Sequence, residues 1–176
     1  MIGPDVQLLF VGINPGLWTA AVNTHFARPG NRFWPAMYLA GITAGQVDAS
    51  DGLTDNQRAA LVDAGVGITN IVDVATARAD ELTGDELAAG GERLRALVRQ
   101  HEPAVVAVLG VTAFRQAFGR RGTVIGPQAE PFEASKLWVL PNPSGLNAHE
   151  TVASLAIWYR RAAEAAGIAL HRDLDG

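Results

Sequence analysis

The sequence predicts an α/β fold in which a mostly parallel sheet of four to five strands lies between two layers of helices. Four short apolar runs indicate strands, at residues 6–13, 66–73, 104–110 and 136–142. The first and third are almost continuous in Val, Leu and Ile, which is typical of parallel strands buried on both faces. Because helical segments separate these runs, we expect βαβ crossovers and a three-layer αβα sandwich.

Helix signals fall between the strands. Capping-box spacings predict helix starts after Thr54 and after Thr83, since each is followed three residues later by Gln or Glu. The second of these helices should stop before Pro103. Further helices are expected within 31–41 and within 150–166, each ended by a glycine.

The composition limits the classes of protein to which the chain can belong. A chain of 176 residues with 48% hydrophobic content predicts one domain, residues 1–176, with 168–176 as a loose tail. The absence of cysteine excludes disulfides, thiolate zinc sites, iron–sulfur clusters and cysteine nucleophiles. The four histidines show no metal-ligand spacing, so we expect no metal and no cofactor. With no basic-apolar leader and no apolar run of about 18 residues, a soluble, cytoplasmic protein is expected.

The net charge of −4 argues at first against a nucleic-acid partner. The distribution of charge weakens that argument. Residues 48–102 hold eleven carboxylates against five arginines, whereas residues 6–47 hold two arginines and no carboxylate. Residues 103–149 hold four basic residues against two acidic ones. The acidity therefore belongs to the middle third, which we interpret as a solvated face.

Two loops of similar composition follow the first and the fourth strand. They read VGINPG and LPNPSGL, and each combines Asn-Pro with a nearby Gly. Pro fixes φ, Gly permits a close approach of main chain to a partner, and Asn supplies both a donor and an acceptor. Ligands of open α/β sheets bind beyond the carboxyl ends of the strands. The pair predicts a site there; neither loop has the spacing of a dinucleotide or P-loop site.

These residues carry a resemblance to a known family. GINPG, the segment FARPGNRFW at residues 26–34, the AAGGERL stretch and LPNPSGL together resemble the mismatch-specific uracil-DNA glycosylases, bacterial relatives of thymine-DNA glycosylase. The similarity runs over residues 8–160. Asn14 in the first motif and Asn142 in the second favour this branch over branches with an acidic first motif and a histidine-led second one.

The resemblance implies how the base is handled. Asn14, a neutral amide, would orient a water toward the anomeric carbon, and Phe26 would stack on the extruded base. Main chain at Ile13 and Phe26 would bind the uracil edge. Thr19 would crowd the methyl group of thymine, so uracil should be preferred. The expected substrate-binding residues are Ile13, Gly16, Thr19, His25, Phe26, Asn31 and Asn142.

The second motif implies how the duplex is opened. Leu146 would fill the gap left in the base stack, and main chain at Gly145 and Asn147 would face the opposite guanine. The spacing of Asn147 and Glu150 also predicts a cap for the last helix. The expected DNA-binding residues are Ser144, Gly145, Leu146, Asn147 and His149. Two departures from the family stand nearby: Ala148 replaces a residue that is often basic, and Asn70 stands where a lysine can occur.

The function expected is therefore excision of uracil from G-mismatched double-stranded DNA, with ethenocytosine and, weakly, thymine as further substrates. Lys136 is the only lysine, and its place at the start of a strand puts it opposite both loops, so we expect no lyase step. A monomer associated with the bacterial nucleoid is the simplest expectation. Two alternatives stay open: a catalytically weak protein that binds DNA damage or abasic sites, and a small-molecule-binding α/β domain.

Overall fold

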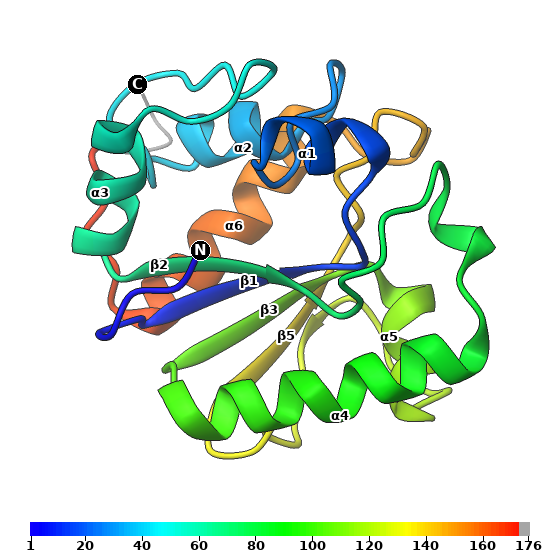
Figure 1. The fold of residues 1–176 in the computed structure, drawn as a ribbon. Helices are drawn as coiled ribbons and strands as arrows, with labels where there is room; N and C mark the ends of the chain where they lie inside the picture. Colours follow the sequence, from blue (N-terminus) through cyan, green and yellow to red (C-terminus); the bar gives the residue numbers. More distant parts are fainter. Residues whose placement is uncertain (173–176) are drawn as a thin grey trace.

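The computed structural model describes residues 1–172, and its sheet has five strands in the order β2-β1-β3-β5-β4 (Figure 1). Their bounds are β1 Leu8–Gly12, β2 Val66–Asn70, β3 Val105–Leu109, β4 Gly126–Pro127 and β5 Lys136–Leu140. The first, second, third and fifth strands are parallel, whereas β4 pairs antiparallel with β5. The four strands predicted from apolar runs are confirmed, and the two-residue edge strand β4 is the addition.

Helices cover both faces of the sheet, which confirms the three-layer sandwich (Figure 1). The helices α1, α2, α3 and α6 lie on one side, and α4 and α5 on the other. Their bounds are α1 Leu17–Val22, α2 Phe33–Leu39, α3 Asp55–Asp63, α4 Gly84–His101, α5 Val111–Phe118 and α6 Val152–Ala166, with a 3₁₀ turn η1 at Ala79–Glu81. Among the helices of residues 1–172, none is long and apolar enough to cross a membrane.

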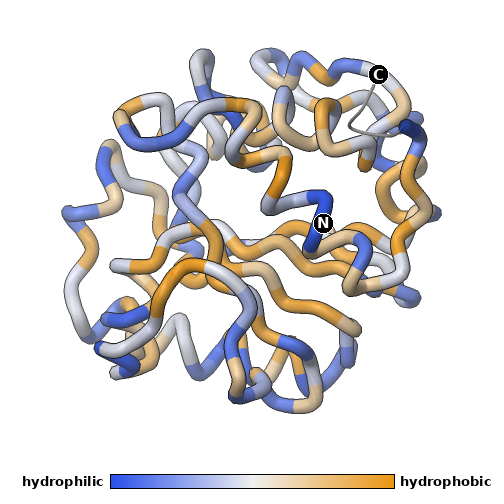
Figure 2. Tube along the Cα trace, turned by 180° about the vertical axis from the view of Figure 1, so that it is seen from behind, coloured by the Kyte–Doolittle hydropathy of each residue, from blue (hydrophilic) through white to orange (hydrophobic). Residues whose placement is uncertain are grey.

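The alternation of side chains along β1 explains why its sequence is apolar throughout. Leu8 and Phe10 point into the cluster that α2 and α6 close, while Leu9 and Val11 point into the cluster under α4 and α5. All four side chains are fully buried. Figure 2 shows the strands as a hydrophobic centre between helices with mixed surfaces. Burial on both faces is what a parallel sheet between helix layers requires.

Helix starts follow the predicted caps, with one correction. The Thr54 and Thr83 capping boxes are both formed, and α4 ends at His101, with Glu102 as its C-cap next to Pro103. The last helix instead begins after Thr151, whose side chain accepts a hydrogen bond from the Ser154 amide. The predicted cap by Asn147 and Glu150 is therefore wrong, because the chain runs four residues further before it turns into the helix.

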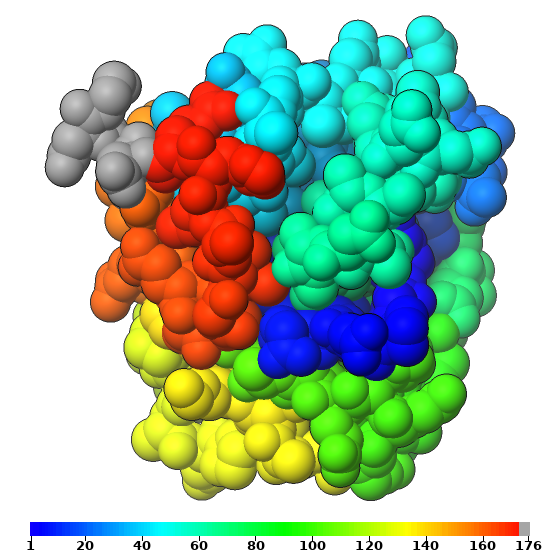
Figure 3. Space-filling model, turned by 90° about the vertical axis from the view of Figure 1, so that its left-hand side faces the viewer, coloured from blue at the N-terminus to red at the C-terminus, as the bar shows by residue number. Residues whose placement is uncertain are grey.

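The C-terminal segment also differs from the expectation of a loose tail at 168–176. Ile168 is buried, the His171 amide donates to the Gly41 carbonyl at 2.8 Å, and the Arg172 guanidinium lies 3.6 Å from the centre of the Tyr38 ring. Figure 3 shows this segment lying against the chain around residue 40. Residues 168–172 are therefore packed, and 173–176 lie outside the described residues.

The strand order places a crevice at the carboxyl edge of the sheet. After β1 the chain crosses to β2 on one side, and after β2 it returns to β3 on the other side of β1. At such a switch point the loops leave in opposite directions and open a space between them. The two Asn-Pro loops follow β1 and β5, so both lie at this edge.

Candidate active site

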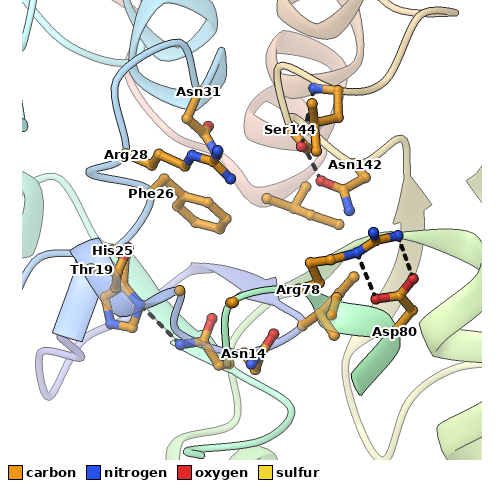
Figure 4. A pocket seen from close by; sticks show the side chains of 17 residues that line it. Asn14, Thr19, His25, Phe26, Arg28, Asn31, Arg78, Asp80, Asn142 and Ser144 are labelled. Carbon is orange, nitrogen blue, oxygen red and sulfur yellow. Dashed lines mark hydrogen bonds and ion pairs between the residues drawn. The ribbon is translucent and has the colours of Figure 1, made fainter. Parts of the chain in front are cut away.

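A cavity of about 320 Å³ lies beyond the carboxyl ends of the parallel strands (Figure 4). Its wall includes Asn14 after β1, Asn70 at the end of β2, Leu109 at the end of β3 and Asn142 after β5. Asn14 and Asn142 are far apart in the sequence, yet they line the same space. The structure thus brings the two loops together, as their shared composition predicts. The volume lies within the usual range of small-molecule sites.

Asn14 is held by its amide nitrogen. This nitrogen donates to the Val74 carbonyl at 2.9 Å and to the Thr76 hydroxyl oxygen at 2.8 Å, with a longer contact of 3.3 Å to the Pro15 carbonyl. A carbonyl oxygen can only accept, so these partners fix which end of the carboxamide is nitrogen. Within residues 1–172, no hydrogen bond engages the Asn14 oxygen. The site therefore offers a directed acceptor on the wall of the cavity.

Phe26 lies between the core and the cavity. Its ring stacks on Phe33 with centroids 4.1 Å apart and planes 23° apart, and it also lines the cavity. Gly12 makes room for it, because a Cβ there would come within 3.0 Å of the Phe26 ring and 2.5 Å of the Asn70 carboxamide oxygen. Phe26 has a φ of +56°, a strained backbone that tertiary packing maintains. One supported ring is thus placed where a planar ligand can stack.

Asn31 and Asn142 are held by their side-chain oxygens, whereas Asn14 is held by its side-chain nitrogen. The Asn31 side-chain oxygen accepts from the Phe33 amide at 2.9 Å, and the Asn142 oxygen accepts from the Ser144 amide at 2.9 Å. Both line the cavity. Within the described residues neither side-chain nitrogen has a hydrogen-bond partner, so both are donors available to a ligand. Figure 4 shows the two on the upper rim, across from Asn14.

His25 and Asn70 form a pair at the side of the cavity. The Asn70 amide nitrogen lies 3.4 Å from His25 Nδ1, and both residues line the cavity. Burial lowers the pKa of His25 to about 4, helped by the positive charges of the Met1 amino group and Arg58 and opposed by Asp73. His25 is therefore neutral near pH 7. Asn70 is itself buried.

The second loop is held from outside by Arg32. Its guanidinium donates to the main-chain carbonyls of Asn147 at 2.7 Å and of Ser144 and Gly145 at 3.3 Å each. The Arg32 amide also donates to the Pro143 carbonyl at 3.0 Å. These contacts tie the loop to the start of α2. Sequence reasoning did not single out Arg32, although its place directly after Asn31 in the motif was visible.

The tip of the second loop is exposed. Leu146 has 79% of its surface in solvent, and it lies on the rim of the cavity with Ser144. Asn147 instead serves the loop itself: its side chain donates to the Asn142 carbonyl and accepts from the His149 amide. Its own amide donates to the Ser144 carbonyl. His149 lines a neighbouring cavity beside α5 and not the main one.

The remaining wall combines expected and unexpected residues. Gly16, Thr19 and Ile13, three of the expected substrate-binding residues, line the cavity. The segment 77–80 closes one side and was not predicted, because it follows β2 without any marked motif. In it Arg78 forms a bidentate pair with Asp80, with contacts of 2.7 and 3.0 Å. Arg28 is also on the wall, and within residues 1–172 no hydrogen bond or ion pair neutralises it.

Comparisons with known proteins agree with this architecture. The model of the uracil DNA glycosylase superfamily matches residues 1–164. The chain is also similar to a candidate uracil DNA glycosylase from Methanosarcina acetivorans, solved by solution NMR, with 18% sequence identity and a TM-score of 0.60. That similarity covers 92% of this chain and 93% of the other, and at this identity it supports the fold alone. Because the family model spans nearly the whole chain, the protein belongs to the uracil DNA glycosylase superfamily.

Proposed function

We propose that the protein excises uracil opposite guanine from double-stranded DNA, as a monofunctional glycosylase of the mismatch-specific branch. Superfamily membership indicates uracil excision in base-excision repair. The observation that carries the finer proposal is the fixed direction of three carboxamides around one cavity. Asn14 offers an acceptor, whereas Asn31 and Asn142 offer donors.

This arrangement favours uracil over cytosine. The uracil edge presents two carbonyl acceptors, while cytosine presents an amino donor in place of one of them. Because the Asn31 oxygen is bound to the Phe33 amide, the side chain cannot turn to accept without losing that bond. A cytosine amino group would then face a donor and stay unpaired, which costs about 1–3 kcal/mol. Phe26 adds stacking that tolerates either pyrimidine.

The proposed reaction depends on the position of the attacking water and not on a strong general base. A water that donates a hydrogen bond to the Asn14 oxygen attacks C1′ while the C1′–N1 bond breaks. The bonding electrons leave on the base, and the proton that the water loses ends on the base anion. The departing base is an anion, so donors such as those of Asn31 and Asn142 stabilise it electrostatically. His25 is neutral and contributes no positive charge. Water placement of this kind serves a leaving group that departs readily, such as uracil.

The opposite guanine would meet the second loop. Guanine presents one acceptor and two donor groups on its pairing edge. In the described residues the Gly145 amide has no partner, and the Gly145 and Asn147 carbonyls, already bound by Arg32, each keep a second lone pair. Leu146 would enter the stack, as apolar wedges do elsewhere. Arg28 provides a positive charge for a nearby phosphate.

The absence of a lyase step rests on Lys136. It is exposed on the first residue of β5, at the amino end of the sheet, opposite the cavity. An amine there cannot reach C1′ of a nucleotide in the cavity to form a Schiff base. We therefore expect an intact abasic strand as the product. A monomer in the cytoplasm, associated with the nucleoid, and needing no metal or cofactor, stays the expectation from sequence.

An alkali assay tests this proposal. An end-labelled duplex with one G·U pair is incubated with excess protein, and half of the sample is then treated with alkali. We expect strand scission after alkali only, and about 100-fold slower formation of the alkali-sensitive product with Asn14→Ala. Scission before alkali would contradict the monofunctional reaction. Binding without scission would favour the alternative, a catalytically weak protein that binds damage or abasic sites.

Assays with further substrates determine the substrate range. G·T, A·U, single-stranded uracil and ethenocytosine are compared with G·U under the same single-turnover conditions. Because Thr19 lines the cavity, we expect thymine to be excised more slowly than uracil. A Thr19→Ser variant, which removes one methyl group, should raise the G·T rate relative to G·U. An unchanged ratio would contradict the assignment of Thr19 to the 5-position of the base.

A further inference from the structure

The direction of the Asn14 carboxamide depends on a residue outside the cavity. Its nitrogen faces two acceptors, the Val74 carbonyl and the Thr76 hydroxyl oxygen. The Thr76 hydroxyl in turn donates its single hydrogen to the Arg78 carbonyl at 2.7 Å. A hydroxyl whose hydrogen is engaged can only accept from a further partner. Thr76 can therefore receive a hydrogen bond from the Asn14 nitrogen but cannot give one to the Asn14 oxygen.

The main chain fixes Thr76 to the same loop. Its amide donates to the Pro15 carbonyl at 3.2 Å, and Thr76 pairs with Gly16 as a short parallel bridge. Thr76 itself is half-buried and is not part of the cavity wall. Thr76 therefore contacts Asn14, which lines the cavity, without lining the cavity itself.

We propose that Thr76 is a positioning residue: with its hydroxyl locked by the Arg78 carbonyl, it turns the Asn14 carboxamide so that the oxygen faces the attacking water. This proposal rests on the proposed glycosylase function for its kinetic consequence, but the orientation itself does not. A rotated carboxamide would direct a donor toward the water and place its oxygen against the Val74 carbonyl. The hydrogen bond from the Thr76 hydroxyl to the Arg78 carbonyl therefore selects the productive one of the two orientations of the Asn14 carboxamide.

Variants of Thr76 can test this role by removing the hydroxyl group while the shape of the side chain stays nearly the same. Thr76→Val deletes the hydroxyl and keeps the branched side chain, whereas Thr76→Ser keeps the hydroxyl. Thr43→Val is the matched control, since the Thr43 hydroxyl also donates to a main-chain carbonyl, that of Gly45, at 2.9 Å. Thr43 does not line the cavity. Thermal unfolding of each variant checks that it is folded at the assay temperature.

Single-turnover excision and binding give the kinetic test. We expect Thr76→Val to lower the excision rate about 3- to 10-fold, the range for loss of one neutral hydrogen bond. Binding to a duplex with a cleavage-resistant 2′-fluorinated deoxyuridine opposite guanine should stay within twofold of wild type. Thr76→Ser and Thr43→Val should excise at the wild-type rate. Equal losses in rate and binding would overturn the proposal, because they indicate a general distortion of the site.

A double-variant cycle tests whether Thr76 acts through Asn14. If it does, Thr76→Val adds no further loss to Asn14→Ala, because the group it positions is gone. Additive losses would contradict the mechanism. The orientation is also observable without activity: the Asn14 side-chain amide signal in a ¹⁵N–¹H NMR spectrum is identified by its disappearance in Asn14→Ala.

In that spectrum, Thr76→Val should shift the Asn14 signal and speed its exchange with water, while Thr76→Ser should not. No change with Thr76→Val would overturn the inference even if uracil is excised. If the wild type fails to excise uracil, the proposed function fails on its own, and the NMR result still decides whether Thr76 orients Asn14. The two outcomes are therefore distinguishable.

Discussion

The two Asn-Pro loops have similar composition but are stabilised in different ways. In the loop after β1, a side chain is fixed: the Asn14 carboxamide is bound by segment 74–76 through its nitrogen. In the loop after β5, the main chain is fixed: Arg32 holds the carbonyls on both sides of the tip. The Leu146 side chain at that tip is left 79% exposed.

Under the proposed function, the two modes of support suit two different tasks. A group that orients one water needs its atoms placed to within a fraction of an ångström, which hydrogen bonds to that side chain provide. A wedge that enters another molecule needs a firm base and a free side chain, which bonds to the main chain provide.

The largest expected effect is on chemistry. Asn14→Ala removes the oriented acceptor, and we expect single-turnover excision of G·U uracil to fall about 100-fold, as for misplaced catalytic geometry. Binding to the cleavage-resistant duplex should stay close to wild type, because Phe26 and the second loop are unchanged. A large loss of binding with little change in rate would assign Asn14 to base recognition.

The second effect concerns how Arg32 supports the loop after β5, whose tip carries Leu146. Arg32→Met keeps the length of the side chain but leaves three carbonyls without their charged donor. We expect affinity for the G·U duplex to fall roughly 10- to 100-fold, since hydrogen bonds to charged groups contribute about 1.5–3 kcal/mol. Arg32→Lys, which keeps a positive charge, should retain part of the affinity for the G·U duplex. Single-stranded uracil needs no wedge, so equal losses on both substrates would refute this role.

The wedge itself gives the third prediction. Leu146→Ala should weaken duplex binding about tenfold, because it removes apolar surface that would be buried between bases. The melting temperature should not change, since the side chain is 79% exposed in the free protein. Ile157→Ala, at a half-exposed position on α6, is the control and should leave binding unchanged. An unaltered affinity for Leu146→Ala would mean that the loop does not enter the stack.

Most of the fold was predictable because its signals are local. The apolar runs and the capping boxes at Thr54 and Thr83 lie within a few residues in the sequence, and all are confirmed. Helices α1 and α5 were not anticipated. Both are short and have no side-chain cap, since Gly16 and Gly110 stand at their N-caps. Their formation depends on tertiary packing, which no local pattern reports.

The site was predictable in its wall residues but not in what holds them. Asn14, Phe26 and Asn142 stand in recognisable motifs, and the structure brings them to one cavity. Arg32 and Thr76 act over separations of about a hundred and about sixty residues. Such long-range contacts depend on strand order, which a single sequence gives only approximately. The misassigned cap of α6 has a different, local origin, since Asn147 bonds within its own loop instead.

A smaller effect concerns the charge state of residue 14. A carboxylate activates water better than an amide, so Asn14→Asp should speed excision. The structure adds a condition: an aspartate oxygen would face the Val74 carbonyl and the Thr76 oxygen, two acceptors, which raises its pKa. We therefore expect the Asn14→Asp excision rate to rise with pH between about 5 and 8. A rate without pH dependence would show that the loop rearranges around the new side chain.

The smallest effect is on stability and comes from His25, on the wall next to the first loop. Its pKa of about 4 lies below the ordinary value of 6.5, mainly because burial penalises the charged ring. Below pH 6.5 the unfolded chain therefore binds a proton that the folded chain refuses, so His25 costs stability as the pH falls from 6.5 toward 4. Comparing urea unfolding of wild type and His25→Gln at pH 7 and pH 5, we expect wild type to lose about 2 kcal/mol more than the variant. Equal losses would mean that His25 is open to water and that this side of the cavity is less closed than Asn70 and Trp34 make it.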